Sequence, residues 1–306
     1  MSQATDHVFL IRPQSFGFNP ETALSNTFQN KLQFDPTVLQ EKVSQEFKAF
    51  AQTLIDHGVH VTIFEDTPVP VKPDAVFPNN WISCHEDGTL VLYPMCTPNR
   101  RAERRADIVE TLKKNFAVTR TIDLTHYESE NRFLEGTGSI IFDHVHRLAY
   151  ACESPRTDHH LFLEVCGLLR HKPVFFHAEN EKGIAIYHTN VMMCVGDSFA
   201  VICLDSIRDE REKAMVENEL KQGNHDIITI SLAQMNSFAG NMLLLEGKNG
   251  NLLALSQCAF DSLTLSQRLQ LEKHTRLLPL SIPTIEGIGG GSARCMIAEV
   301  RFPKIQ

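Results

Sequence analysis

Short apolar segments alternate with polar turns along this chain, in an order that recurs four times. Each recurrence opens with an apolar strand that ends in small or polar residues, and a second apolar strand follows after a short turn. This arrangement is typical of a β-hairpin. We expect the opening strands in DAVFPNNWIS (74–83), NRFLEGTGSIIF (131–142), GIAIYHTNVMMCV (183–195) and NSFAGNMLLL (236–245).

A charged stretch with the spacing of an amphipathic helix follows each hairpin, and a further apolar strand closes each unit. The helices are expected in 100–116, 157–170, 208–222 and 262–275, and the closing strands in 118–124, 172–178, 226–231 and 277–283. A fifth unit is split between the chain ends. It takes HVFLIRP (7–13) and a helix over 35–58 from the N-terminal part, and a strand around CMIAEVRF (295–302) from the C-terminal part.

These five ββαβ units predict an α/β fold in which the units close into a ring. Such units cannot bury their apolar faces alone, and a closed ring leaves no long exposed sheet edge. We therefore expect a five-bladed α/β propeller that spans residues 1–306 as a single catalytic domain. Equivalent positions near the polar ends of the opening strands recur every 52–55 residues and should converge on the axis: Asn80, Glu135, His188, Gly240 and Cys295.

Three of these converging residues form a candidate catalytic set. Cys295 follows the glycine run of GGGSARC (289–295), where the backbone can come close to another group. A thiol nucleophile needs an adjacent base or cation, because only a few per cent of a free cysteine is thiolate at neutral pH. His188 can supply that base, and Glu135 can hold and orient the imidazole.

Each of these residues also has a structural interpretation. His188 is otherwise a core or surface histidine, Glu135 a turn carboxylate that bonds its own backbone, and Cys295 a core thiol beside a glycine-rich loop. The run GIGGGS is not a phosphate loop, because the required strand, lysine and helix do not follow in order. A catalytically silent propeller that binds a small molecule is therefore an alternative, and a metal-dependent hydrolase is another.

Composition narrows the class of partner. Hydrophobic residues make up 42% of the chain and charged residues 22%, and the net charge is −8, which argues against nucleic acid or an anionic membrane. The eight cysteines form no C-x-x-C pair and no secretory signal is recognisable, so we expect reduced thiols in the cytoplasm. No membrane span and no zinc-ligand spacing is found in the sequence. We expect a small-molecule substrate, no cofactor and no metal, and a homo-oligomer is compatible with the sequence.

With VFPNNW, FLEGTGSIIFD, YHTNVMM and GGGSARCM, the chain resembles the pentein superfamily of guanidine-modifying enzymes. The opening FLIRPQSFGFNPETALSNTFQ is most similar to the branch called citrulline utilisation hydrolases, often labelled amidinotransferase-like. The resemblance implies that Cys295 attacks the central carbon of a guanidino or ureido group and that His188 shuttles protons. It also implies that Glu135 binds the substrate nitrogens and tunes His188.

The chain departs from the superfamily at three acidic positions. The E-G-G-D motif reads EGTG here, the F-x-x-D motif of arginine deiminases reads Phe77-Pro-Asn-Asn80, and their H-x-D motif reads His188-Thr-Asn190. An amide suits a neutral ureido group, whereas a guanidinium cation needs paired anions. We therefore expect substrate contacts from Phe77, Asn80 and Asn190 and a citrulline-like substrate. An arginine deiminase or amidinotransferase is the alternative, and Asn80 and Asn190 also have ordinary turn and strand-end roles.

The amino-acid end of such a substrate requires a cation for its carboxylate. Arg12 ends the first strand and Arg294 precedes the nucleophile, and arginine is suited to bind a carboxylate through two parallel hydrogen bonds. Either arginine can instead form a structural ion pair. Of the two, Arg12 is taken as the expected carboxylate-binding residue, and Asn241 in FAGNML is a further candidate contact.

Overall fold

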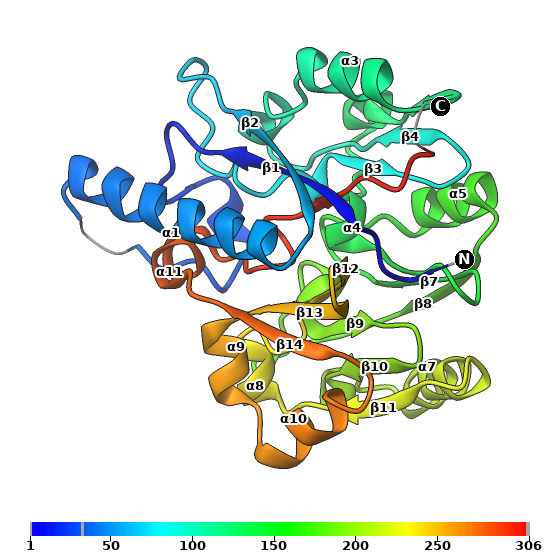
Figure 1. Ribbon diagram of the computed structural model, residues 1–306. Coiled ribbons are helices and arrows are strands. Elements are labelled where there is room, and N and C mark those ends of the chain that lie inside the picture. The colour runs from blue at the N-terminus through cyan, green and yellow to red at the C-terminus, as the bar shows by residue number, and fades with distance from the viewer. Residues whose placement is uncertain (1, 32–33, 304–306) are drawn as a thin grey trace.

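The computed structural model describes residues 2–31 and 34–303. The strands of this part of the chain form five sheets of three strands each. In every sheet the central strand pairs antiparallel with one neighbour and parallel with the other. Figure 1 shows the sheets arranged around a common centre with helices on the outside. The expected five-bladed α/β propeller is therefore confirmed.

Four blades are continuous in the sequence. The first contains β3 (Ile82–Cys84), β4 (Thr89–Leu92), α2 (Pro98–Arg101), α3 (Ala106–Asn115) and β5 (Arg120–Asp123). The second contains β6 (Ile141–Asp143), β7 (Leu148–Cys152), α5 (His159–Leu169) and β8 (Lys172–Phe176). The third contains β9 (Met193–Val195), β10 (Phe199–Ile202), α7 (Glu210–Gln222) and β11 (Asp226–Thr229). The fourth contains β12 (Leu243–Gly247), β13 (Gly250–Ser256), α9 (Gln257–Ser262), α10 (Leu265–Leu271) and β14 (Arg276–Leu280).

The fifth blade is assembled from both ends of the chain, as expected. Its strand β15 (Ala298–Glu299) pairs antiparallel with β1 (His7–Arg12), and β1 pairs in parallel with β2 (His60–Glu65). The helix α1 (Pro36–Asp56) connects β1 to β2. The sequence pattern did not predict β2, although HVTIFE has the β-branched and aromatic content of a strand.

The opening strands of the blades are shorter than the sequence pattern predicted. The segments that carry the polar residues are helical turns that precede the strands: a 3₁₀ turn at Pro78–Asn80, α4 (Gly136–Ser139) and α6 (Thr189–Met192). Gly136 has φ of +47°, and at this position a Cβ would lie 2.5 Å from the carbonyl oxygen of Asn79. The first of these turns begins at Pro78 and the second at Gly136, and the chemical groups lie on the turns before the paired strands.

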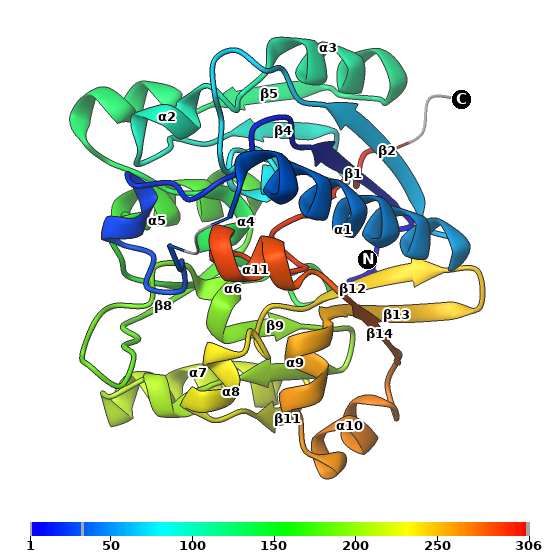
Figure 2. The same ribbon diagram turned by 90° about the vertical axis from the view of Figure 1, so that its left-hand side faces the viewer.

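The helix α1 and the short helix α11 (Pro283–Gly289) pack side by side, which Figure 2 shows from the front. Asp35 caps α1 by accepting hydrogen bonds from the backbone N–H groups of Thr37 and Val38. The carboxylate of Glu46, on α1, accepts hydrogen bonds from the first free N–H groups of α11, with N–O distances of 2.9 Å to Thr284 and 3.0 Å to Ile285. Since α11 leads into the loop that carries Cys295, α1 helps to hold that loop in place.

Gln3, in the N-terminal segment, forms hydrogen bonds with two other parts of the ring. Gln3 donates a hydrogen bond to the carbonyl oxygen of Phe142 and accepts one from the N–H group of His144, both at 2.8 Å. Its own carbonyl oxygen accepts a hydrogen bond of 2.9 Å from Arg301. Gln3 thus joins the N-terminus and the C-terminal segment to the second blade.

We expect Gln3→Ala to lower the free energy of unfolding by about 1–3 kcal/mol, because it leaves a buried N–H and a buried carbonyl without partners. Urea denaturation followed by circular dichroism measures the change. Gln257→Ala is the matched control, since the amide of Gln257 is exposed and bonds only Asp261. Equal stability of the two variants would show that Gln3 does not close the ring.

Candidate active site

The structure brings the predicted catalytic residues to the centre of the ring. Glu135 directly precedes α4, His188 directly precedes α6, and Cys295 lies in the turn before β15. All three are buried. His188 and Cys295 line one cavity. Glu135 is not part of the cavity lining and forms a hydrogen bond with Nε2 of His188. Residues more than 100 positions apart in the sequence therefore meet at equivalent places in three of the blades.

Glu135 is a fully buried carboxylate with four polar partners. One oxygen lies 2.9 Å from Nε2 of His188, 3.5 Å from a guanidinium nitrogen of Arg156 and 3.8 Å from one of Arg100. The other oxygen accepts a 3.0 Å hydrogen bond from the N–H group of Cys96. Burial by itself raises the pKa of Glu135, but Arg156, His188 and Arg100 together lower it below its ordinary value. Glu135 is therefore ionised at neutral pH.

An ionised Glu135 fixes the tautomer of His188. Because a carboxylate only accepts hydrogen bonds, Nε2 of His188 carries the hydrogen, and Nδ1 of the neutral ring keeps a lone pair. Burial lowers the pKa of His188 to about 4, and the hydrogen bond that His188 donates to Glu135 opposes that shift. The imidazole is thus neutral at pH 7 and can accept a proton at Nδ1.

The sulfur of Cys295 is held by two amides. Asn190 and Asn241 each direct a side-chain N–H toward it, at 3.4 Å and 3.3 Å. The amide orientation of Asn241 is fixed because its oxygen accepts a 3.0 Å hydrogen bond from the backbone N–H of Arg294. An N–H donor directed at sulfur can form a hydrogen bond to a thiolate, so these two residues hold the nucleophile in place.

Cys295 and His188 share a small cavity at the centre of the ring. Phe77 and Asn80 line it, as expected. The glycines at 289 and 291 have a different role from the one inferred from the sequence. At either position a Cβ would lie 2.9 Å from the ring of Phe77, so the glycines make room for that ring and only indirectly for a ligand.

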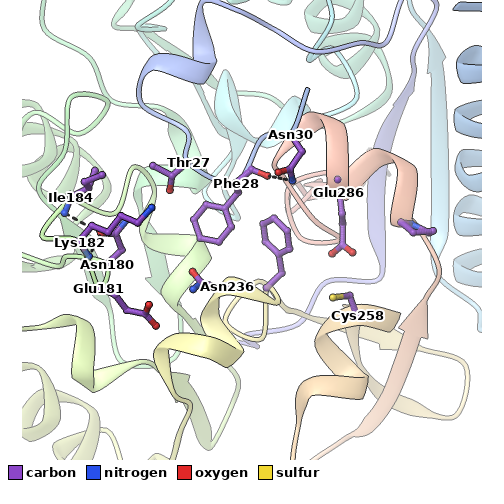
Figure 3. Close-up of a pocket in the computed structure, with 13 residues that line it drawn as sticks. Thr27, Phe28, Asn30, Asn180, Glu181, Lys182, Ile184, Asn236, Cys258 and Glu286 are labelled. Atoms are coloured by element: carbon purple, nitrogen blue, oxygen red, sulfur yellow. Dashed lines mark hydrogen bonds between the residues drawn. The ribbon is translucent and has the colours of Figure 1, made fainter. Parts of the chain in front are cut away.

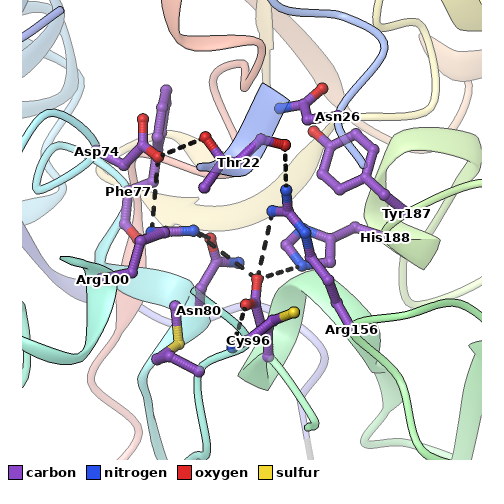
Figure 4. Close-up of polar contacts among 12 residues, drawn as sticks. Thr22, Asn26, Asp74, Phe77, Asn80, Cys96, Arg100, Arg156, Tyr187 and His188 are labelled. Atoms are coloured by element: carbon purple, nitrogen blue, oxygen red, sulfur yellow. Dashed lines mark hydrogen bonds and ion pairs between the residues drawn. The ribbon is translucent and has the colours of Figure 1, made fainter. Parts of the chain in front are cut away.

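Six further residues that line this cavity were not identified from the sequence: Thr22, Asn26, Asp74, Arg100, Arg156 and Tyr187. Figure 4 shows Arg100 between Asp74 and Asn80, and Arg156 beside His188. Arg100 donates a 2.8 Å hydrogen bond to the side-chain oxygen of Asn80 and lies 3.8 Å from Asp74. The two arginines follow the second strand of successive blades and are about one repeat apart, which is a signal that the sequence did contain.

Arg12 lies outside the cavity, which corrects the expectation that it binds a substrate carboxylate. It pairs in register with Glu65 of β2 and forms an ion pair with it, and its guanidinium lies over the ring of Phe47. Arg294 also points elsewhere, since it bonds the carbonyl oxygen of Ile297 and the carboxylate of Glu299. Both arginines thus have the structural role that the sequence left open.

A larger pocket of about 470 Å³ lies beside the cavity (Figure 3). Phe28 lines it and packs against Tyr187 of the cavity, with 6.0 Å between ring centroids. Glu286 also lines it and accepts a hydrogen bond from Ser292, three residues before Cys295. Burial raises the pKa of Glu286 to about 7. Cys258, on the same wall, is exposed.

Comparison with known proteins decides the family. The model of the family described as "N,N dimethylarginine dimethylhydrolase, eukaryotic" matches residues 12–302. The chain belongs to this family. The family is described as one of hydrolases, and the match confirms the resemblance to the pentein superfamily seen in the sequence. No curated protein sequence matches the chain significantly.

Solved structures agree with this family assignment at the level of the fold. The arginine dihydrolase ArgZ of the ornithine–ammonia cycle in cyanobacteria has a TM-score of 0.76 at 15% identity, over 98% of this chain but 41% of that one. The N-terminal domain of ArgZ, in a cysteine-to-serine variant bound to substrate, also has a TM-score of 0.76. The identity is 16%, over 98% of this chain and 99% of that domain. A dimethylarginine dimethylaminohydrolase adduct with S-methyl-L-thiocitrulline gives 0.64 at 14% identity, over 97% and 99% of the two chains. The chain thus spans about two fifths of the full-length arginine dihydrolase.

We expect Asn190→Asp to slow alkylation of Cys295 by iodoacetamide at pH 7 by about tenfold or more. The substitution replaces an N–H donor near the sulfur with a carboxylate, and hydrogen bonds to charged groups contribute about 1.5–3 kcal/mol. The experiment requires the Cys258→Ser background, since Cys258 is exposed and reacts regardless of the site. Peptide mass spectrometry follows the rate, and unchanged alkylation would remove Asn190 as a support of the thiolate.

Proposed function

We propose that the chain is a cysteine-dependent hydrolase that acts on the ureido or guanidino carbon of a small amino acid, with citrulline as its preferred substrate. The products from citrulline are ornithine, ammonia and carbon dioxide. The family assignment and the grouping of Cys295, His188 and Glu135 support the reaction class. The choice between a ureido and a guanidino group depends on the polar atoms around the sulfur.

The observation that carries the choice of citrulline is a pair of unpartnered amide atoms. Arg100 fixes the oxygen of Asn80 as an acceptor, so the side-chain nitrogen of Asn80 remains a donor without a partner among the described residues. The side-chain oxygen of Asn190, beside Cys295, is a buried acceptor that likewise lacks a partner in the described part of the chain. A ureido group has a carbonyl acceptor and N–H donors and satisfies both atoms.

The charges of the cavity also favour a neutral group. Arg100 and Arg156 line the cavity, and a guanidinium ligand would lie next to these two like charges. Asp74 lines the cavity and is a second carboxylate in this region besides Glu135. Arg100 lies near both carboxylates, so they do not form a free anionic site for a cation.

Arginine remains the second candidate substrate, because one oxygen of Asp74 is buried in this region without a partner among the described residues. That oxygen can accept a hydrogen bond from a guanidinium nitrogen. The arginine dihydrolase ArgZ, which shares the fold, is named for that substrate. Burial raises the pKa of Asp74, and Arg100 opposes the shift. Asp74 is therefore protonated more readily than Glu135, whose pKa is lowered.

The proposed reaction proceeds by covalent catalysis. Nδ1 of His188 takes the proton of the Cys295 thiol, and the thiolate adds to the ureido carbon. The developing oxyanion is stabilised by the Asn80 amide and by N–H groups of the 289–295 loop. The tetrahedral intermediate collapses as the imidazolium of His188 protonates the leaving amine, which leaves a carbamoyl group on the sulfur. Water activated by His188 then releases carbamate, which decomposes to ammonia and carbon dioxide.

The wider setting of the enzyme is also proposed. We propose one catalytic domain over residues 1–306 that uses its own side chains for each step and acts in the cytoplasm on a small amino acid. In the described part of the chain, no helix is both long enough and apolar enough to cross a membrane.

The test of the function is turnover of citrulline and of arginine by the pure protein, with ornithine, citrulline and ammonia measured. We expect citrulline to be consumed and Cys295→Ala to be inactive. Asn80→Asp should lower kcat/KM for citrulline by about tenfold or more and that for arginine by less, because it replaces a donor to the ureido oxygen with an acceptor.

The control is Asn236→Asp, which adds the same charge in the larger pocket. It should leave kcat/KM for citrulline and for arginine unchanged. Turnover of arginine alone would overturn the choice of citrulline. Binding of citrulline without turnover of either amino acid would favour a catalytically silent propeller.

We expect kcat/KM to be constant from neutral pH down to about 5 and to fall as the pH drops through about 4, where His188 becomes protonated and cannot accept the thiol proton. In Glu135→Gln this limb should move to lower pH at a much reduced rate, because Glu135 raises the pKa of His188. Circular dichroism at each pH separates this effect from acid unfolding. A limb near pH 6.5 would contradict the buried, neutral imidazole.

A further inference from the structure

A second cluster of polar side chains lies outside the cavity of Cys295, between the second and third blades. Asp143 ends β6, His146 lies in the turn before β7, and His225 connects α7 to β11. Nδ1 of His146 is 2.9 Å and Nε2 of His225 is 3.4 Å from the same oxygen of Asp143. The three ligand atoms lie within 4.8 Å of one another. The proposed reaction uses none of them.

The tautomer of His225 leaves a lone pair facing a carboxylate. Its Nδ1 lies 3.2 Å from the carbonyl oxygen of Leu220, which only accepts, so Nδ1 carries the hydrogen. Nε2 then presents its lone pair to Asp143, and it has no hydrogen-bond partner among the described residues. The side chains of His225 and Asp143 are both fully buried.

We propose that Asp143, His146 and His225 bind a divalent transition-metal ion of the zinc type, with water as the fourth ligand. Zinc bonds of about 2.0–2.1 Å in tetrahedral geometry separate ligand atoms by roughly 3.3 Å, close to the observed 2.9 Å and 3.4 Å. The hydrogen bond from His225 to the carbonyl of Leu220 is the usual outer support of a ligating histidine.

The surroundings of the cluster suit an ion. At Gly223 a Cβ would lie 2.7 Å from Nδ1 of His225 and 3.2 Å from Nδ1 of His146, so the glycine keeps the space between the two rings open. His146 is exposed, which gives an ion and its water a path from solvent. A bound ion would join the β6–β7 turn of the second blade to the third blade, so its role is structural.

The test is titration of Zn²⁺ into protein stripped with EDTA, by calorimetry and thermal unfolding, in a Cys295→Ala, Cys258→Ser background that removes the site thiol and the exposed thiol. We expect one bound Zn²⁺ and a Tm that rises with Zn²⁺ and falls again with EDTA. His146→Ala, in an exposed turn that tolerates substitution, should weaken binding by more than the roughly 10–100-fold that loss of an outer-shell partner costs. His225→Gln should act in the same direction.

The matched control is His274→Ala. His274 lies 2.9 Å from Asp226, and this pair lacks a second histidine close enough to share an ion among the described residues. Its loss should leave zinc binding unchanged. No zinc binding by the background protein, equal binding by His146→Ala, or an equal loss in His274→Ala would each overturn the proposal. The first two outcomes would mean that Asp143 and His146 form only a hydrogen-bonded pair.

Discussion

The buried carboxylate of Glu135 is the group on which the arrangement of the site depends. A carboxylate removed from water stays ionised only if cations and hydrogen-bond donors compensate for the lost solvent. Here the compensation comes from His188, Arg156, Arg100 and the N–H group of Cys96. Each of these partners is thereby fixed, so one charge determines the tautomer of the base and the position of both arginines.

The two arginines also form hydrogen bonds with residues around the cavity. Arg100 also bonds the side chain of Asn80, the carbonyl oxygen of Phe77 and the carboxylate of Glu103. Arg156 reaches the N-terminal segment, where it bonds the carbonyl oxygen of Thr22 and the hydroxyl of Ser25. The segment that covers the cavity and the amide that faces the ligand are thus connected through Glu135. These two cations are also the electrostatic basis of the proposed preference for a ureido substrate.

The sequence predicted the features that recur from blade to blade. The recurring hairpin, helix and strand gave the five blades, and equal spacing identified Glu135, His188 and Cys295, which the ring then brought together. Arg12 was wrong because a strand-end position does not say whether a side chain pairs across the sheet, and parallel pairing places it opposite Glu65. The opening strands were too long because apolar residues that line a turn have the same pattern as residues of a short strand. Asp74 was missed because its role depends on contacts between segments far apart in the sequence, which no local pattern records. Arg100 and Arg156 were missed although their spacing of about one repeat was a usable signal.

The protonation state of His188 is the most direct test of this account. Nuclear magnetic resonance of protein with ¹⁵N-labelled histidine, assigned with a His188→Gln variant, reports which ring nitrogen carries the hydrogen. We predict a neutral ring at pH 7, with its hydrogen on Nε2 and no hydrogen on Nδ1. An imidazolium at that pH, or a hydrogen on Nδ1, would contradict the central role of Glu135.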